Sequence, residues 1–238
     1  MIKLCPSEVC TGCSSCINAC PKNCIKMIEN LEGFLYPVID NKLCVECGMC
    51  QNVCPELNIV PKNSNPIVYA SWSLKDKIRM SSSSGGLFFA IAQHIINKGG
   101  VVYGVVFNDD MSVSHKSAVT LDELRFMQGS KYIQSNINMT YKEALSYLKK
   151  DRYVMFTGTP CQIAGFKSFL GNKIYNNLIL VDIVCHGTPP AKMLKWYLNE
   201  LKKKLGDFNE STFCFRNLNA WGVTPSVEIS KTRHYNYW

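Results

Sequence analysis

The sequence lacks an apolar run long enough to cross a membrane. Its most apolar stretch, GLFFAIAQHIINKGGVVYGVVF, is interrupted by Gln93, His94, Asn97 and Lys98, whereas a membrane-spanning helix needs about 20 predominantly apolar residues. The N-terminal residues MIKLCPSEVC also lack the apolar core of a secretory signal peptide. We therefore expect no membrane span and a cytoplasmic location.

A compact basic block is also missing, although the formal net charge is +8. The densest basic run, LKKKLG at 201–206, has no interleaved aromatic residues, and we expect it to form the solvated end of a helix. A nucleic-acid-binding domain would gather its lysines and arginines on one face, so we expect no nucleic acid as a partner. The first 60 residues hold four lysines and six acidic residues, a formal charge of −2, which leaves +10 for the remainder. This imbalance suits an anionic cofactor or an acidic redox partner.

Cysteine, by contrast, is abundant and concentrated. The chain has 13 cysteines, and ten of them lie between Cys5 and Cys54. Without an export signal they are not expected to form disulfides, because the cytosol keeps thiols reduced. Cysteine at this density in a reducing compartment indicates metal binding.

The first sixty residues contain an internal repeat, Cys-x-x-Cys-x-x-Cys-x-x-x-Cys-Pro, at 10–21 and again at 44–55. This is the bacterial ferredoxin pattern, in which three cysteines of a run bind one 4Fe–4S cluster and the fourth binds the other cluster. Zinc also accepts Cys-x-x-Cys ligands, but it has no use for four cysteines per run followed by proline. The sequence therefore predicts two 4Fe–4S clusters. The expected ligands are Cys10, Cys13, Cys16 and Cys54 for the first cluster, and Cys44, Cys47, Cys50 and Cys20 for the second.

The remainder of this region completes a small domain. Between the two runs, IKMIENLEGFLYPVID reads as a β-hairpin that turns at Glu32-Gly33. Cys5 and Cys24 lie outside the repeat, and we expect them to pack as small apolar residues. PKNSNP at 61–66 has the composition of a linker. We therefore expect a two-cluster ferredoxin domain over 1–60 and a second domain over 67–238.

The second domain is expected to be α/β. SSSSGG precedes LFFAIAQHIINKGG, whose apolar residues follow helical spacing, with the serines as N-caps. TLDE (120–123) and TYKE (140–143) are capping boxes that each open a helix. IVYASWSL and GVVYGVVF read as strands, and RYVMF, CQIAGFKSFLG and LILVDIVC read as a βαβ unit. The predicted fold class is α+β overall, with a small ferredoxin-like two-cluster domain followed by an α/β domain that contains βαβ units.

Two loops follow the strands of this βαβ unit, TGTPC at 157–161 and CHGTPP at 185–190. Ligands of open α/β sheets bind beyond the carboxyl ends of the strands. SSSSGG adds a helix N-terminus of the kind that favours phosphate, although such a run is also an ordinary helix cap. These features indicate a bound cofactor.

A cysteine hydrolase is an alternative reading of the first loop. Cys161, His186 and Asp182 would form a Cys–His–Asp set at a strand-to-helix turn. However, the turn lacks the Gly-x-[Ser/Cys]-x-Gly form, because Pro160 precedes the cysteine and Gln162 follows it. A pair of iron–sulfur clusters also has no role in acyl transfer, so we regard the hydrolase as the weaker interpretation.

Five stretches of the second domain, taken in order, resemble the coenzyme F-420 hydrogenase/dehydrogenase beta-subunit family. They are SSSSGGLFFAIAQHII, QGSKYIQS, VMFTGTPCQIAGFKSFL, VDIVCHGTPP and FRNLNAWG. Together with the ferredoxin module, the resemblance covers nearly the whole chain. Longer members of the family continue into a further cysteine-bearing segment. The resemblance implies an iron–sulfur flavoprotein oxidoreductase, in which clusters feed FAD and FAD exchanges a hydride with a deazaflavin or another low-potential acceptor.

The resemblance also implies a set of flavin contacts. A flavin has a chemical reason to be present, since it converts between the single electrons of a cluster and the electron pair of a hydride. Lys131 and His186 would neutralise flavin phosphates or the reduced ring, and the alternative for Lys131 is a surface lysine. The implied cofactor-binding residues are Ser83, Gly85, Gly86, Ser130, Lys131, Tyr132, Gln134, Thr157, Gly158, Thr159, Pro160, Cys161, Gln162, His186 and Gly187.

The expected partner is a redox protein or a small electron carrier. An alternative function from a different class is a non-catalytic electron carrier of the ferredoxin type, in which the second domain serves only to dock a partner enzyme. Iron without flavin in the purified protein would favour this alternative.

Overall fold

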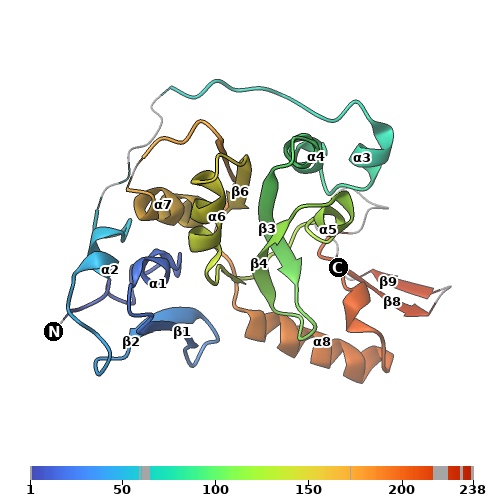
Figure 1. The fold of residues 1–238 in the computed structure, drawn as a ribbon. Helices are drawn as coiled ribbons and strands as arrows, with labels where there is room; N and C mark the ends of the chain where they lie inside the picture. Colours follow the sequence, from blue (N-terminus) through green and yellow to red (C-terminus); the bar gives the residue numbers. More distant parts are fainter. Residues whose placement is uncertain are drawn as a thin grey trace.

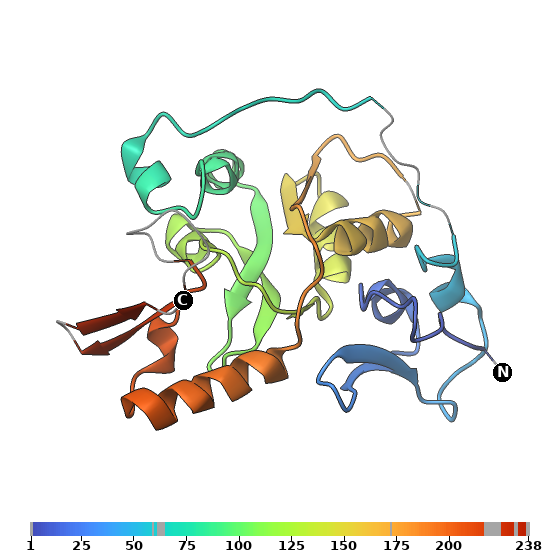
Figure 2. The ribbon, with the colours of Figure 1, turned by 180° about the vertical axis from the view of Figure 1, so that it is seen from behind.

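The computed structural model describes residues 2–58, 60, 65–171, 173–216, 225–230 and 233–236. The described part consists of a small cysteine-rich module, built from residues 2–58, that packs against an α/β domain (Figures 1 and 2). No described helix is both long and apolar enough to cross a bilayer.

The cysteine-rich module repeats one backbone motif twice. The short helices α1 (Ser15–Ala19) and α2 (Met49–Asn52) each lie inside one cysteine run. Their N-caps, Ser14 and Gly48, occupy equivalent positions of the repeat, and both have left-handed backbone angles (φ 63° and 74°). Each run therefore makes the same turn before its helix.

The predicted hairpin joins the two runs. Strands β1 (Ile25–Glu29) and β2 (Leu35–Ile39) pair antiparallel, with Ile25 opposite Ile39. In Figures 1 and 2, α1 lies on the side of the module that faces the α/β domain, whereas α2 lies on the outer side.

The α/β domain is built on a five-stranded mixed sheet. Its strand order is β5 (Ser135–Asn136), β4 (Val113–Ala118), β3 (Val101–Phe107), β6 (Val154–Gly158) and β7 (Leu178–Asp182). Strands β3, β6 and β7 are parallel, and β4 is antiparallel to β3. The predicted βαβ unit is β6, α7 (Pro160–Phe169) and β7. The expected fold class, a small iron–sulfur module followed by an α/β domain, is confirmed.

Helices cover both faces of this sheet, because alternate strand residues point to opposite faces. Val101 and Tyr103 pack under α6 (Thr140–Leu148) and α7. Val102 and Val106 pack under α4 (Leu87–Asn97) and α5 (Leu121–Arg125).

A third apolar cluster lies beside the sheet, under α8 (Ala191–Leu205), whose Leu194, Leu198 and Leu201 are buried. The expected solvated end of a helix at 201–206 is the last turn of α8. The remaining elements are α3 (Asp76–Met80), a short 3-10 helix (Glu210–Thr212), and the antiparallel strands β8 (Ser226–Ser230) and β9 (Arg233–Asn236).

Three local predictions were wrong. The segment IVYASWSL forms no strand and runs exposed across the domain, with Val68 at 87% and Leu74 at 89% exposure, because no neighbouring strand offers it a partner. Helix α4 is not capped by a serine side chain; its N-cap is Gly86 in a left-handed conformation. TYKE is not a capping box, since the Thr140 hydroxyl donates back to the Ile137 carbonyl.

The capping box predicted at Thr120 and Glu123 is confirmed. The predicted linker falls largely outside the described residues, at 61–64, as does most of FRNLNAWG, at 217–222. The domain boundary therefore stays a prediction.

Candidate functional site

Two cavities in the cysteine-rich module bring the expected cluster ligands together in crossed sets. Each cavity contains cysteines of one run together with the last cysteine of the other run. The first is lined by Cys10, Cys13, Cys16 and Cys54, and the second by Cys20, Cys44 and Cys47, while Cys50 borders both. This is the arrangement that crossed ligation requires, because the last cysteine of each run has left its own loop. Ligation by these residues stays a prediction.

The thiols fit a cluster better than a single ion. Among the described residues, no three His, Cys, Asp or Glu side chains converge closely enough to hold one metal ion, and zinc would need its sulfur ligands about 2.3 Å from one centre. A 4Fe–4S cubane spreads its four ligands over four irons, so it accepts thiols that lie further apart. Leu4 and Pro37 add apolar wall to the first cavity, and Ile2 and Ile39 to the second.

The thiols must lose protons when a cluster binds. Burial raises the pKa of Cys13 to about 12 and also raises the pKa of Cys16 and Cys10 above the ordinary thiol value. Because only the thiolate binds metal, cluster assembly in these cavities releases protons.

A fifth thiol adjoins each set of expected ligands. Cys24 is buried, and its sulfur lies 3.4 Å from that of Cys20. Cys5 lines the first cavity together with Cys54. The interpretation of Cys5 and Cys24 as packing residues stays a prediction, but the structure places both beside expected ligands.

The first cysteine run packs directly against the α/β domain. The Tyr141 hydroxyl of α6 lies between the carbonyl oxygens of Gln162, at 2.7 Å, and Cys13, at 2.9 Å. Ser15 donates to the Gly165 carbonyl of α7 at 2.9 Å. A Cβ atom on Gly165 would lie 3.0 Å from the Cys13 sulfur. The glycine therefore allows α7 to approach a predicted cluster ligand.

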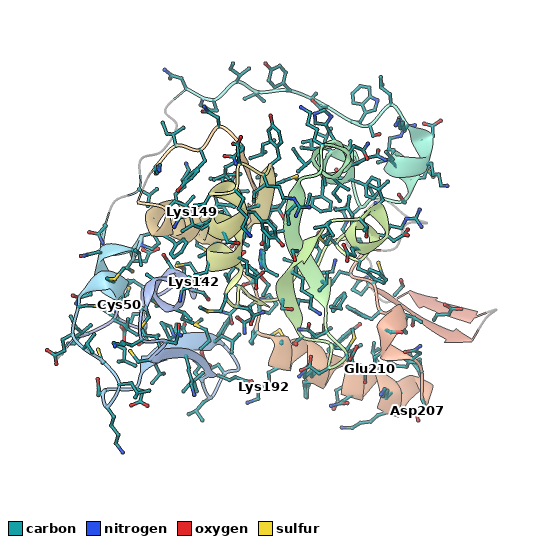
Figure 3. The ribbon with its side chains drawn as sticks, viewed as in Figure 1. Cys50, Lys142, Lys149, Lys192, Asp207 and Glu210 are labelled. Carbon is teal, nitrogen blue, oxygen red and sulfur yellow. The ribbon has the colours of Figure 1, made fainter. Side chains whose placement is uncertain are left out.

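Further polar contacts connect the two parts of the chain. The Gln134 side-chain amide makes two hydrogen bonds with the Leu35 backbone. Its oxygen accepts from the Leu35 N–H at 2.8 Å, and its nitrogen donates to the Leu35 carbonyl at 3.3 Å. Lys142 of α6 reaches Asn23 at 3.1 Å, and Lys192 of α8 reaches the Leu31 carbonyl at 2.9 Å. Figure 3 labels both lysines at the border between the module and the α/β domain. The module is thus held in one orientation.

A buried polar network lies behind the TGTPCQ turn, and sequence reasoning missed its centre, His115. The imidazole contacts the Thr157 carbonyl at 2.9 Å and the Ser135 hydroxyl at 3.0 Å. Gln162 also donates to that hydroxyl at 3.0 Å. Burial lowers the pKa of His115 to about 4, so the ring is neutral at pH 7. A histidine within strand β4 carried no motif that would have revealed it.

The buried imidazole predicts that stability falls in mild acid. His115 has a pKa of about 4 in the folded state and roughly 6.5 when unfolded. Below pH 6.5 the unfolded chain therefore binds the proton first, so the stability present above that pH is lost as the pH falls toward 4. The slope approaches about 1.4 kcal/mol per pH unit. Urea midpoints of the holoprotein at pH 7 and pH 5 measure it. His115→Gln should lose this slope and His94→Gln, at an exposed position, should keep it; equal slopes in both variants would contradict the assignment.

The residues of the TGTPCQ turn bond mainly to one another. Thr157 donates to the Tyr103 carbonyl at 2.9 Å. Thr159 and Gln162 form a capping box at the start of α7, with Pro160 in the first turn. The Gln162 side chain covers Gly158, since a Cβ atom there would lie 3.0 Å from its oxygen. The Cys161 thiol stays half-buried, 3.1 Å from the Thr159 hydroxyl.

The structure brings together a second group of predicted flavin contacts. The Ser130 amide donates to the Ser83 hydroxyl at 3.2 Å, which places the serine run beside the GSKY segment. Lys131 is half-buried, and its ammonium group donates to the carbonyls of Gln128 (2.9 Å) and Gly129 (3.2 Å). Burial lowers the pKa of Lys131 to about 8.

The other predicted contacts are scattered. Tyr132 is 40% exposed and meets Phe215 edge to face. Gly85 packs on the Ser71 carbonyl and Trp72, and Gly86 caps α4. His186 and Gly187 are exposed in the loop after β7.

The hydrolase set is not assembled. Asp182 and His186 are both exposed, and no hydrogen bond between described residues joins either of them to Cys161, whose thiol partner is Thr159. These positions provide neither a base beside the sulfur nor a group to orient that base.

Comparisons with known proteins match both parts of the chain. The crossed cysteine sets and the dicluster match together support an iron–sulfur protein. Residues 9–58 match the family described as 4Fe-4S dicluster domain, and residues 151–234 match the family that describes the C terminus of the coenzyme F420 hydrogenase/dehydrogenase beta subunit. The resemblance expected from the sequence is confirmed: one segment of the chain is similar to a dicluster domain, and a later segment is similar to the C terminus of that beta subunit.

Among solved structures, a chain of the F420-reducing [NiFe] hydrogenase complex from Methanosarcina barkeri is similar, with 15% identity and a TM-score of 0.47. The match covers 71% of this chain and 60% of that chain, so the present chain spans less than two thirds of its length. No curated protein matches.

Proposed function

We propose that this protein passes electrons between its two 4Fe–4S clusters and a flavin, FAD, held by the α/β domain. The flavin would exchange a hydride with a deazaflavin-type or other low-potential acceptor, and a redox protein or small electron carrier would serve as partner. The observation that carries the proposal is the contact between Cys13 and α7 at Gly165. It brings the first cluster cavity against the helix that begins at the TGTPCQ turn.

A bound flavin would supply the exchange between one-electron and two-electron chemistry. Several implied contacts already have structural partners, and Gln134, Thr159 and Gln162 are the clearest of them. The groups that remain accessible are the exposed or half-buried ones, and these would hold the flavin. Those without a closed partner network include Ser83, Ser130, Tyr132, Cys161, His186 and Gly187.

The hydrogen bonding of the TGTPCQ turn supports a second candidate function. If the TGTPCQ turn serves only to cap α7, the protein is an electron carrier of the ferredoxin type with a docking domain. The closed capping box of Thr159 and Gln162 favours this reading.

Anaerobic reconstitution distinguishes the two functions. The flavoprotein should bind about eight irons per chain. After incubation with FAD and gel filtration, it should also retain a flavin absorption band at about 450 nm, because the flavin couples hydride chemistry to the clusters. His186→Ala should weaken FAD retention, whereas Lys149→Ala, at an exposed position beyond α6, should not. Iron without retained FAD would refute the flavoprotein and leave the carrier.

A further inference from the structure

The two cluster cavities differ in their distance from the α/β domain. Gln134, Lys142 and Lys192 contact the hairpin and its flanks. The contacts nearest a cluster cavity come from the first run and its helix: Cys13 meets Gly165, Ser15 bonds the Gly165 carbonyl, and Asn18 donates to the Asn138 carbonyl at 2.9 Å. No hydrogen bond of the described residues joins 47–58 to the α/β domain. The first cavity is therefore the inner one.

The second cavity opens outward. Cys47 is exposed, and the apolar side chains of Leu43, Val45 and Met49 beside it are 56%, 56% and 43% exposed. Figures 1 and 2 both place α2 on the outer side of the module, farther from α6 than α1. A redox partner that approaches the module from solvent thus meets the second cavity first.

One face of α7 completes the inner contact. Cys161 and Gly165 are four residues apart, so they share a face of the helix. Gly165 has no side chain, which allows the Cys13 sulfur to approach within van der Waals range of the helix. Cys161 lies one helical turn before Gly165, in the TGTPCQ segment where α7 begins. The rate of electron tunnelling falls steeply with distance, so this close approach favours transfer here over transfer from the second cluster.

We propose that the first cluster is the inner member of the electron path and the second cluster the outer member. Electrons cross to the α/β domain where Cys13 meets the Cys161–Gly165 face of α7. The second cluster exchanges electrons with a protein partner. The proposal rests on the proposed function, in which clusters and a flavin exchange electrons. Each step moves one electron: the partner, a one-electron donor, is oxidised as the second cluster is reduced. That cluster in turn reduces the first, and no bond forms or breaks.

Proteins that retain a single cluster test the inner contact. Cys20→Ala should leave only the first cluster, and Cys54→Ala only the second. Gly165→Ala adds a methyl group 3.0 Å from the Cys13 sulfur. In the dithionite-reduced protein it should therefore shift the EPR spectrum and midpoint potential of the first cluster and leave those of the second unchanged.

Lys167→Ala, at an exposed position on the same helix, is the matched control and should shift neither cluster. If Gly165→Ala does not fold, Cys161→Ser takes its place with the same expectation. A shift of the second cluster, or of neither cluster, would overturn the inner assignment.

A rate measurement tests the outer assignment. Stopped-flow mixing with a reduced ferredoxin should reduce the protein that holds only the second cluster several-fold faster than the protein that holds only the first. Equal rates, or the reverse order, would refute the proposal. Neither experiment needs bound flavin, so failure of FAD to bind would count against the proposed function and leave both results interpretable.

Discussion

Replacing Cys54 with alanine is expected to lower the iron content from about eight to about four per chain and to remove the cluster of the first run. Cys54 lines the cavity that holds Cys10, Cys13 and Cys16, and it lies apart from the second cavity. The cluster of the second run keeps its four ligands and survives. Iron analysis and EPR of the anaerobically reconstituted protein measure the loss.

Double substitutions identify which cluster is lost. Residues that serve one cluster act as a unit, so their effects do not add. Adding Cys13→Ala to Cys54→Ala should cost no further iron, whereas adding Cys47→Ala should remove the remaining four. The opposite pattern would mean that each run binds its own cluster. Cys24→Ala serves as the thiol control, and about eight irons should remain, since Cys24 is expected to be a packing residue.

The sequence predicted the cysteine-rich module well because its constraints are local. Ligand spacing and the proline that follows each run determine the loops, and the two runs turn alike at Ser14 and Gly48. The βαβ unit around TGTPCQ was also predictable, since buried strands and an intervening helix leave a clear periodic pattern.

Contacts between distant segments were not predictable. Gln134 was assigned to a flavin through the family resemblance, yet its amide bonds the backbone of Leu35, almost a hundred residues away. His115 sits in a strand with no motif around it, and only the packed fold brings it to Ser135 and Thr157. The strand predicted at 67–74 does not form. Its β-branched and aromatic residues favour a strand, but a strand needs a neighbouring strand to pair with, and the fold supplies none there.

Those long-range contacts give the molecule its functional organisation. The cluster module alone would be a ferredoxin whose two cavities are related by the sequence repeat. Packing against α6 and α7 removes that equivalence, because Cys13 becomes part of a domain interface while Cys47 stays exposed. A methyl group at 165 would lie 3.0 Å from the Cys13 sulfur, so we expect even this small addition to disturb the contact.

Tyr141→Ala is expected to have the largest effect on stability, about 3–5 kcal/mol, as for other large aromatic side chains removed from a core. The ring is fully buried and stacks on Phe166 at 4.8 Å between centroids, with Phe156 at 5.3 Å. Its hydroxyl also connects α6 to the cluster loop at Cys13. Urea unfolding of the holoprotein, followed by circular dichroism and by cluster absorbance, measures the loss.

Tyr141→Phe separates the two contributions of this side chain. The ring remains, so the global cost should be about 1–2 kcal/mol for the lost hydrogen bonding. The carbonyl of Cys13 loses a partner, so the cluster absorbance should decay at lower urea than the helical signal, whereas the two should coincide in the unmodified protein. Tyr153→Phe, at a side chain 40% exposed in front of β6, is the matched control and should leave both transitions in place. Coincident transitions in Tyr141→Phe would show that this hydroxyl does not couple the cluster loop to the α/β domain.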